Sequence, residues 1–351
     1  MTRLRPKGET ATLHATPRPR YSHLRRLTDG IGVFEHARFD VPRRAHGYCV
    51  DDVARALLVA VHAEEQTDPI REMTETYLRF LERAIDPSGL AHNRMAVDGS
   101  WTDEPALGDW WGRTLWATGV ASIQAADPSM RRDAAAVFHR AALSIPTALH
   151  TAAFAALGAG PVLIADPTDG AAQRLVERFA EMLPIHPDSA WPWPENRLRY
   201  GNGSVAEAAI VSGRALQDPA ITARGLSMLS FLLETEKRSG HLSVTGTGGR
   251  GPTETEAQFD QQPIEVAAIG DACVAAFAAT ADPAWLDGVE LAWSWFEGDN
   301  DSGVSMVDME TGAGFDGLEP GGCNLNRGAE STLAALATWQ LARRFLPLGA
   351  A

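Results

Sequence analysis

The chain has 351 residues, of which 45% are hydrophobic and 22% are charged, and its mean hydropathy is −0.15. This composition is typical of a globular protein and is too apolar for a disordered one. The formal net charge is −14 and no basic face is visible in the sequence. Binding to nucleic-acid phosphates needs such a face, so no nucleic-acid partner is predicted.

The cysteines and the N-terminus exclude further classes of protein. Cys49, Cys273 and Cys323 show no CxxC spacing, so neither a disulfide framework nor a zinc site is predicted. We predict no metal and no cofactor. No apolar run follows the basic N-terminus, and we find no membrane-spanning stretch of about 18 uncharged apolar residues. We therefore expect a cytoplasmic protein without a membrane partner. It would have a flexible tail over residues 1–18 and one domain over 19–351, with its oligomeric state left open.

Five Asp-Pro pairs stand where amphipathic segments begin. An aspartate carboxylate accepts hydrogen bonds from the free N–H groups of a first helical turn, and proline fits the first helical position. The recurrence of one start signal indicates an internal repeat of helices with one polar face. The pairs are Asp68-Pro69, Asp127-Pro128, Asp166-Pro167, Asp218-Pro219 and Asp282-Pro283.

A second, more apolar and alanine-rich set of helices alternates with these. Several members are apolar nearly all round, which indicates burial. Ser204 and Glu207 have the spacing of a capping box, and a segment near Tyr21–Thr28 could supply a twelfth helix. With no strand of any length, the sequence predicts an all-α protein of six helical hairpins. The buried helices are expected to begin near Asp51, Asp109, Pro146, Ser204, Pro263 and Arg327.

The connections between these helices are unequal in length. Those that lead from an amphipathic helix into a buried one are long, whereas those in the other direction span only a few residues. All long loops should therefore open on one face, where the buried helices begin. Long ordered loops on one face of a rigid scaffold commonly carry the binding site. The long connections are residues 86–108, 185–203, 237–262 and 298–326.

These loops and helix starts are rich in carboxylates, amides and tryptophans, a combination that suits sugars. A sugar stacks its C–H face on an aromatic ring while its hydroxyls exchange hydrogen bonds with carboxylates and amides. Each feature also has a structural reading. Asp51, Asp52 and Asp109 could cap helices, and the Trp191–Pro194 run could plug the ring. Glu265 and Glu330 could be structural partners of arginines in place of site acids.

The motifs GYCVDDVARAL, WPWPENRL, FDQQPIE and LNRGAESTLAAL resemble a group of bacterial six-hairpin glycosidase-like proteins. These proteins are often labelled glycosyltransferase-associated and occur near mannoside phosphorylase and glycosyltransferase genes. The resemblance runs from about residue 22 to 345. It implies an (α/α)6 toroid, with six inner and six outer helices, and carbohydrate as the substrate class. It supplies no catalytic assignment.

From the chemistry of the residues we predict an inverting glycoside hydrolase that acts on an oligosaccharide. Such an enzyme needs one carboxylic acid to protonate the leaving oxygen and one carboxylate to activate water. We predict Asp52 and Asp260 as this pair, with Asp109 and Glu195 in reserve. The predicted substrate-binding residues are Tyr48, Asp51, Trp110, Trp111, Arg113, Trp191, Trp193, Asn196, Arg197, Gln261, Gln262, Glu265, Asn326 and Glu330.

Three other functions fit the same residues. A phosphorylase would gather Arg113, Arg197 and Arg327 around a phosphate. A sugar epimerase would need histidines as acid and base, for which His150 alone is slender support. A non-catalytic sugar-binding partner of polysaccharide metabolism would hold its carboxylates in ion pairs, with none facing another across an open cleft.

Overall fold

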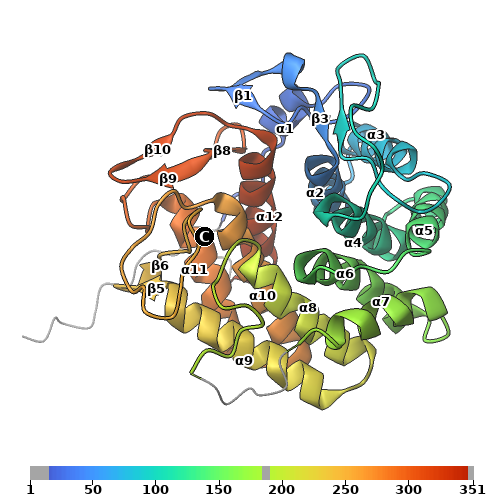
Figure 1. Ribbon diagram of the computed structural model, residues 1–351. Helices are drawn as coiled ribbons and strands as arrows, with labels where there is room; N and C mark the ends of the chain where they lie inside the picture. Colours follow the sequence, from blue (N-terminus) through green and yellow to red (C-terminus); the bar gives the residue numbers. More distant parts are fainter. Residues whose placement is uncertain (1–15, 184–189, 347–351) are drawn as a thin grey trace, which may run out of the picture.

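Helical hairpins arranged around a central axis form a ring (Figure 1). The computed structural model describes residues 16–183 and 190–346. Most of the predicted tail, residues 1–15, therefore lies outside the described residues. The last part of the predicted tail is anchored to the final helix, because the Trp339 indole donates to the carbonyl of Pro17 at 2.7 Å and Arg343 donates to that of Thr16 at 2.9 Å.

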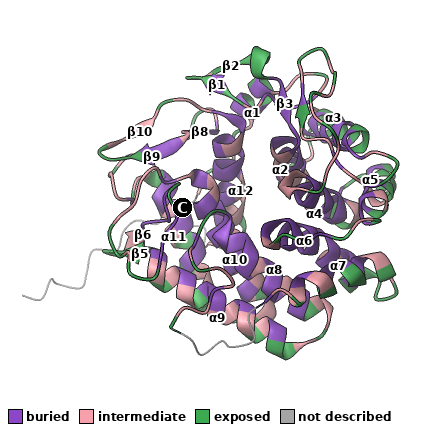
Figure 2. Cartoon of the chain, viewed as in Figure 1, coloured by how far each residue is buried: buried purple, intermediate pink, exposed green. Residues whose placement is uncertain are grey.

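Six helices line the inside of the ring, as the sequence predicts. Each contacts the next inner helix along the chain, and the last contacts the first, so the ring is closed. Figure 2 shows these helices to be largely buried. They are α2 (Val50–Val61), α4 (Asp109–Gln124), α6 (Leu149–Ala165), α8 (Asn202–Ala215), α10 (Pro263–Thr280) and α12 (Ala329–Phe345).

The outer helices pack against the inner ones and expose their polar faces (Figure 2). The segment near Tyr21–Thr28 supplies the twelfth helix of the described chain, as expected, and it contacts α12. The outer helices are α1 (Ser22–Leu27), α3 (Asp68–Ala84), α5 (Pro128–Ala141), α7 (Gly170–Ala180), α9 (Pro219–Glu236) and α11 (Leu286–Glu297), the last preceded by a 3-10 turn, η2 (Pro283–Trp285). The all-α prediction and the six-hairpin arrangement are confirmed.

The Asp-Pro pair marks a helix start at four of its five positions. Asp127, Asp218 and Asp282 are N-caps whose carboxylates accept from first-turn N–H groups. Asp68 is the first residue of α3, and Thr67 is the N-cap there. The fifth is wrong, because α7 begins at Gly170 and the carboxylate of Asp169, not Asp166, accepts from its first N–H groups.

The predicted capping box at the start of α8 is also wrong. The helix begins at Asn202, so Ser204 lies inside it. Gly201 precedes it with φ of 60°, a left-handed conformation that glycine adopts without strain. The start of α6 is also shifted, since this helix begins at Leu149 and was expected to begin near Pro146.

The long loops carry short antiparallel strand pairs and a 3-10 turn, η1 (Arg44–His46). Each pair holds a loop in shape beside the N-terminal ends of the inner helices. The pairs are β1 (Ala37–Arg38) with β2 (Val41–Pro42), β3 (Tyr48–Cys49) with β4 (Arg94–Met95), β5 (Lys237–Arg238) with β6 (His241–Leu242), β7 (Val307–Asp308) with β8 (Ala313–Gly314), and β9 (Gly317–Glu319) with β10 (Gly322–Asn324).

One described helix, α10, is long and apolar enough to cross a membrane by length and composition, although it carries Glu265 and Asp271 and so is not an uncharged stretch. In the structure α10 is an inner helix of the ring. It contacts α8, α11 and α12, and 56% of its apolar window is buried. A core helix of a ring needs this apolar composition because neighbours surround it.

Inner helices α4 and α6 approach closely through glycines. A β-carbon at Gly158 would collide with the carbonyl oxygen of Leu115, and one at Gly119 would collide with the carbonyl of Gly158. The two backbones can lie this close only because neither position carries a side chain.

We therefore expect Gly158→Ala to lower the free energy of unfolding by about 2 kcal/mol, the usual cost of overpacking a core. Urea unfolding followed by circular dichroism measures this loss. Gly170→Ala is the control, since a β-carbon there would meet only Arg174, at 3.8 Å. Equal stability of the two variants would mean that α4 and α6 lie farther apart than described.

Candidate active site

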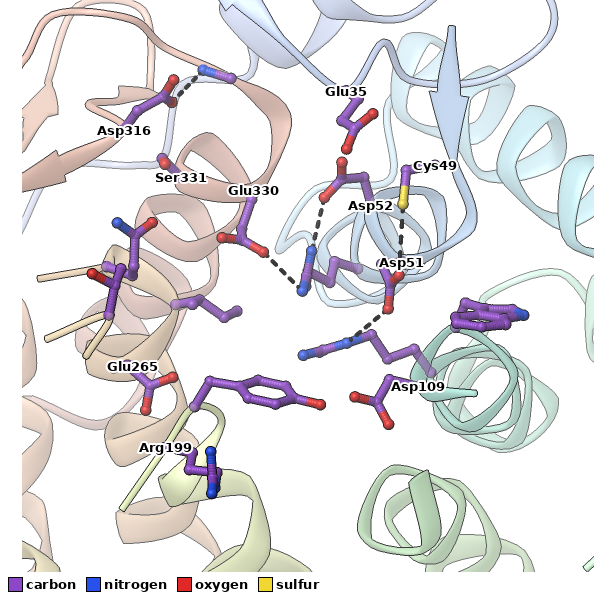
Figure 3. Close-up of a pocket in the computed structure, with 18 of the residues that line it drawn as sticks. Glu35, Cys49, Asp51, Asp52, Asp109, Arg199, Glu265, Asp316, Glu330 and Ser331 are labelled. Atoms are coloured by element: carbon purple, nitrogen blue, oxygen red, sulfur yellow. Dashed lines mark hydrogen bonds and ion pairs between the residues drawn. The ribbon is translucent and has the colours of Figure 1, made fainter. Parts of the chain in front are cut away.

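A cavity of about 800 Å³ opens where the inner helices begin. Four inner helices each place an acid there from the first turn. Asp51 and Asp52 come from α2, Asp109 from α4, Glu265 from α10 and Glu330 from α12 (Figure 3). The N-terminal end of a helix favours a negative charge, so the fold itself stabilises a ring of acids at this site.

The long loops complete the wall of the cavity. The loop before η1 brings Glu35, the 86–108 connection brings Arg94, and the 191–202 segment brings Tyr200. Residues 245–249, Thr-Gly-Thr-Gly-Gly, form another side, and Asp316 stands beyond them. The predicted gathering of the long loops on one face is therefore confirmed for these described segments.

Two buried arginines organise the acids. Arg55 donates to the Asp52 carboxylate at 2.8 Å and lies 2.9 Å from the Glu330 carboxylate, so it bridges α2 and α12 (Figure 3). Arg113 lies 3.1 Å from Asp51, with its side chain only 4% exposed. These pairs fix the acids in position while leaving Asp109 free of an ion pair with any described residue.

Asp52 has a pKa well above that of an ordinary aspartate. Burial raises its pKa to about 7, Arg55 opposes the rise, and the nearby Glu330 and Glu35 carboxylates add to it. Loss of hydration disfavours the charged form of a carboxyl group. At neutral pH this side chain therefore holds a proton in a large fraction of molecules, as a general acid requires.

Glu265 has a similar shift and a clear structural role. Burial raises its pKa to about 8, assisted by Glu236. Its carboxylate accepts hydrogen bonds from the backbone N–H groups of Gly201 and Asn202, and from the Asn202 side chain at 3.1 Å. It thereby ties α10 to the start of α8, next to the loop that carries Tyr200.

Two aromatic rings line the cavity. Trp110 is partly buried, and its indole N–H donates to the carbonyl of Ala91 at 2.8 Å, which fixes the ring. Tyr200 is 44% exposed and stacks on His150 with 4.6 Å between centroids. Both could present a flat apolar surface to a sugar ring.

The structure brings half of the eighteen predicted site residues to this cavity, and the others lie elsewhere. Those that line it include two of the predicted acids and seven of the predicted binding residues. They are Asp51, Asp52, Asp109, Trp110, Arg113, Arg197, Gln262, Glu265 and Glu330.

Three of the tryptophans predicted to stack on a sugar, Trp111, Trp191 and Trp193, do not line the cavity. Trp111 is fully buried and donates to the carbonyl of Gly89 at 2.8 Å. Trp191 and Trp193 pack near Phe231 of the outer helix α9, at 5.1 and 6.3 Å between centroids. Trp191 also donates to the carbonyl of Glu195. Their apolar rings contribute more stability in the core than they would at a wet surface.

Two of the four predicted catalytic acids also lie outside the cavity. Asp260 sits against Gly317 and beside Gln262, with its Oδ1 atom buried and without a described hydrogen-bond partner. Burial and the neighbouring Glu319 raise its pKa. Glu195 lies 3.9 Å from Arg199. The predicted Asp52 and Asp260 pair therefore does not share the cavity wall.

Four other predicted binding residues, Tyr48, Asn196, Gln261 and Asn326, do not line the cavity. Tyr48 is buried and donates its hydroxyl to Asp29 at 2.8 Å. Gln261 is fully buried and donates to Asp301 at 2.6 Å. Asn326 accepts from the backbone N–H of Phe39 at 3.0 Å, and Asn196 is exposed away from the cavity wall. The polar groups of Tyr48, Gln261 and Asn326 are therefore engaged within the protein.

Several wall residues were missed by the sequence reading. Arg55 had a readable signal, because it follows Asp52 by three residues and so shares its helix face. The loop residues had none, since no periodic pattern fixes the path of a loop. The missed residues with polar or aromatic side chains are Glu35, His36, Cys49, Arg55, Asn93, Arg94, Arg199, Tyr200, Thr245, Thr247, Asp316 and Ser331.

One group in the wall has the spacing of metal ligands. Ligand atoms of Glu35, Cys49 and Asp52 all lie within 4.8 Å of one another. Glu35 already pairs with Arg94, and Asp52 with Arg55. Burial and the negative charge of Asp51 raise the pKa of the Cys49 thiol, so a thiolate ligand is disfavoured. This donor set fits a metal poorly, and we derive no step through one.

Comparison with known proteins agrees with this architecture. No protein-family model matches the sequence, and no curated protein matches it. Among solved structures, the chain is similar to cellobiose 2-epimerase from Bacillus thermoamylovorans, with a TM-score of 0.69 at 12% identity, over 93% of this chain and 96% of that one. The cellulase of C. cellulolyticium in complex with cellobiose gives 0.62 at 10%, over 92% and 89%.

A third similar structure is a variant α-1,6-mannanase of Salegentibacter sp. in complex with α-1,6-mannotriose. It gives a TM-score of 0.60 at 11% identity, over 92% of this chain and 96% of that one. At these identities the likeness defines the fold. The chain has the (α/α)6 toroid fold that the motif resemblance implied.

Proposed function

We propose that this protein is a carbohydrate-active enzyme, and specifically an inverting glycoside hydrolase that acts on an oligosaccharide. The observation that carries the proposal is the cavity at the inner helix starts, where the protonatable acid Asp52 shares a wall with Asp109, Trp110 and Tyr200. Acids that can donate a proton, together with flat rings, are what cleavage of a glycosidic bond requires.

Asp52 is the proposed general acid and Asp109 the proposed general base. Asp52 donates its proton to the leaving oxygen, and Asp109 takes one from the attacking water. Thr151 donates a hydrogen bond to Asp109 at 2.7 Å, which holds that carboxylate in place. The two acids stand in the first turns of the neighbouring inner helices α2 and α4. Inversion requires that a sugar and a water fit between them.

The mannanase structure offers a parallel for α2. According to its title, that inactive variant has asparagine in place of two consecutive aspartates. This sequence contains one pair of consecutive aspartates, Asp51 and Asp52, and both line the cavity. The parallel supports a catalytic use of this helix start.

Hydrolysis predicts a specific pH dependence. Asp52 acts as an acid only while protonated, so kcat/KM should fall as pH rises through about 7, the pKa of Asp52. A pH profile of reducing-end release from manno- and gluco-oligosaccharides measures this limb. A rate that keeps rising from pH 6 to pH 9 would exclude Asp52 as the proton donor.

Other reactions find less support in the geometry. Arg113 and Arg197 line the cavity but pair with Asp51 and Glu254, while Arg327 does not line it, so these three arginines do not form the predicted phosphate cluster. Of the described histidines, only His36 lines the cavity, which is too few for a histidine acid and base. Cleavage should therefore proceed without added phosphate, and the product should be a shorter sugar, not an epimer.

A non-catalytic sugar-binding protein would keep its acids in ion pairs. Asp51, Asp52 and Glu330 are indeed paired, but Asp109 and Glu265 have no ion pair with a described residue. The reducing-end assay separates the two functions, since a binding protein releases no new ends from any oligosaccharide that it binds.

A further inference from the structure

A second cavity, of about 940 Å³, occupies the centre of the ring beneath the first. Arg55, Arg113 and Ile264 line both cavities and therefore lie between them. The volume is that of a typical site for a small organic ligand. Most of the wall is apolar, with Leu58 and Val211 among the residues that line it, so the inner helices enclose a hollow that the proposed hydrolysis does not use.

Two acids line this apolar space from neighbouring inner helices. Glu207 comes from α8 and Asp271 from α10, and both line the cavity. Neither has an ion pair or a hydrogen bond with another described residue, and the Oε2 atom of Glu207 is buried without a partner. The acids of the first cavity differ, because Asp52 and Glu330 share Arg55.

Burial makes the ionised form of both acids unfavourable. Burial raises the pKa of Asp271 to about 7, and burial together with the Asp271 charge raises that of Glu207 well above its usual range. A carboxylate in an apolar site needs a cation or a proton to offset its lost hydration. Arginines also line the cavity, but neither Glu207 nor Asp271 has a described cationic partner that would offset this cost.

The residues that line the cavity indicate which class of cation would bind there. Calcium needs six to eight oxygen ligands and magnesium an octahedral set. The carboxyl groups that line this cavity are those of Glu207, Asp271 and Glu64, the last paired with Arg343, and most of the wall is hydrocarbon. An ammonium group on an apolar body matches both parts of the wall. Trp116, which also lines the cavity and stacks on Phe154 at 6.0 Å, could add a cation–π contact.

We propose that this central cavity binds an organic ammonium ion, with its nitrogen between Glu207 and Asp271 and its apolar body against the surrounding helices. An organic anion is the alternative ligand, because Arg214, Arg343 and Arg344 also line the cavity. Of these, Arg343 already contacts Glu64 and the carbonyl of Thr16.

Isothermal titration calorimetry of the full chain with n-hexylammonium chloride tests the proposal. n-Hexanol and n-hexanoate serve as probes with the same apolar body and a neutral or negative head. We expect one hexylammonium ion per chain, and at least tenfold weaker binding of both other probes. The proposal is overturned if hexanoate binds as tightly as hexylammonium, or if no probe binds at millimolar concentration.

Variants locate the site. Glu207→Gln with Asp271→Asn keeps the shape of both side chains and should weaken hexylammonium binding at least tenfold. Asp316→Asn, in the first cavity, should leave it unchanged. Unchanged binding by the double variant would overturn the assignment. If that variant does not fold, the comparison of the three probes on the wild-type chain decides the matter alone.

Discussion

Asp52→Asn should lower kcat/KM for oligosaccharide cleavage by about 10³-fold, the usual contribution of a general acid. Asparagine has the same shape and can still accept from Arg55, which donates to Asp52 at 2.8 Å in the wild type. It has no proton to give to the leaving oxygen. Reducing-end assays under saturating and limiting substrate separate kcat from KM, and the loss should appear in kcat.

Asp260→Asn is the matched control for this experiment. It is the same substitution at an acid that the sequence favoured but that does not line the cavity. We expect kcat/KM close to that of the wild type. Near-normal activity of Asp52→Asn, or an equal loss in both variants, would contradict the assignment of the proton donor to α2.

Glu265→Ala should lower the free energy of unfolding by about 3 kcal/mol, because buried donors lose their acceptor. These donors are the N–H groups of Gly201 and Asn202 and the Asn202 side chain. Activity should fall as well, since the Tyr200 loop enters α8 at this point. Glu265→Gln keeps an acceptor oxygen and should lose less stability. Urea unfolding of both variants at pH 7 measures the difference.

The stability of the wild type should also depend on pH through Glu265. Its pKa of about 8 in the folded chain lies above the ordinary glutamate value of 4.5. The folded state therefore holds a proton that the unfolded chain releases, and this stabilisation is complete below about pH 4.5 and is lost as pH rises through about 8. Glu265→Gln cannot titrate, so the difference between wild type and variant should shift against the wild type from pH 5 to pH 8. A constant difference would show that Glu265 is ionised when folded.

Helix starts explain why part of the site could be read from the sequence. Asp51, Asp109, Glu265 and Glu330 each stand in the first turn of an apolar helix, and the inner helices of a closed ring of hairpins point their N-terminal ends the same way. Periodicity and chain direction alone therefore predict that these acids meet. Arg55 follows from helix periodicity instead, because it lies three residues after Asp52 on the same helix face.

Loop positions could not be read in this way. Trp191 and Trp193 stand in a sequence that suits sugar stacking, yet they pack near Phe231 on an outer helix. Asp260 follows the same rule, since two residues separate it from α10 and its carboxylate lies beside Gly317. Which face a loop side chain takes depends on tertiary packing, for which the sequence has no period.

The most direct test of the central claim is a crystal structure of Asp52→Asn soaked with mannotriose or cellotriose. The account predicts a sugar in the 800 Å³ cavity, with its glycosidic oxygen in hydrogen-bond reach of residue 52 and a ring against Trp110 or Tyr200. A sugar bound elsewhere on the chain, with this cavity empty, would contradict it.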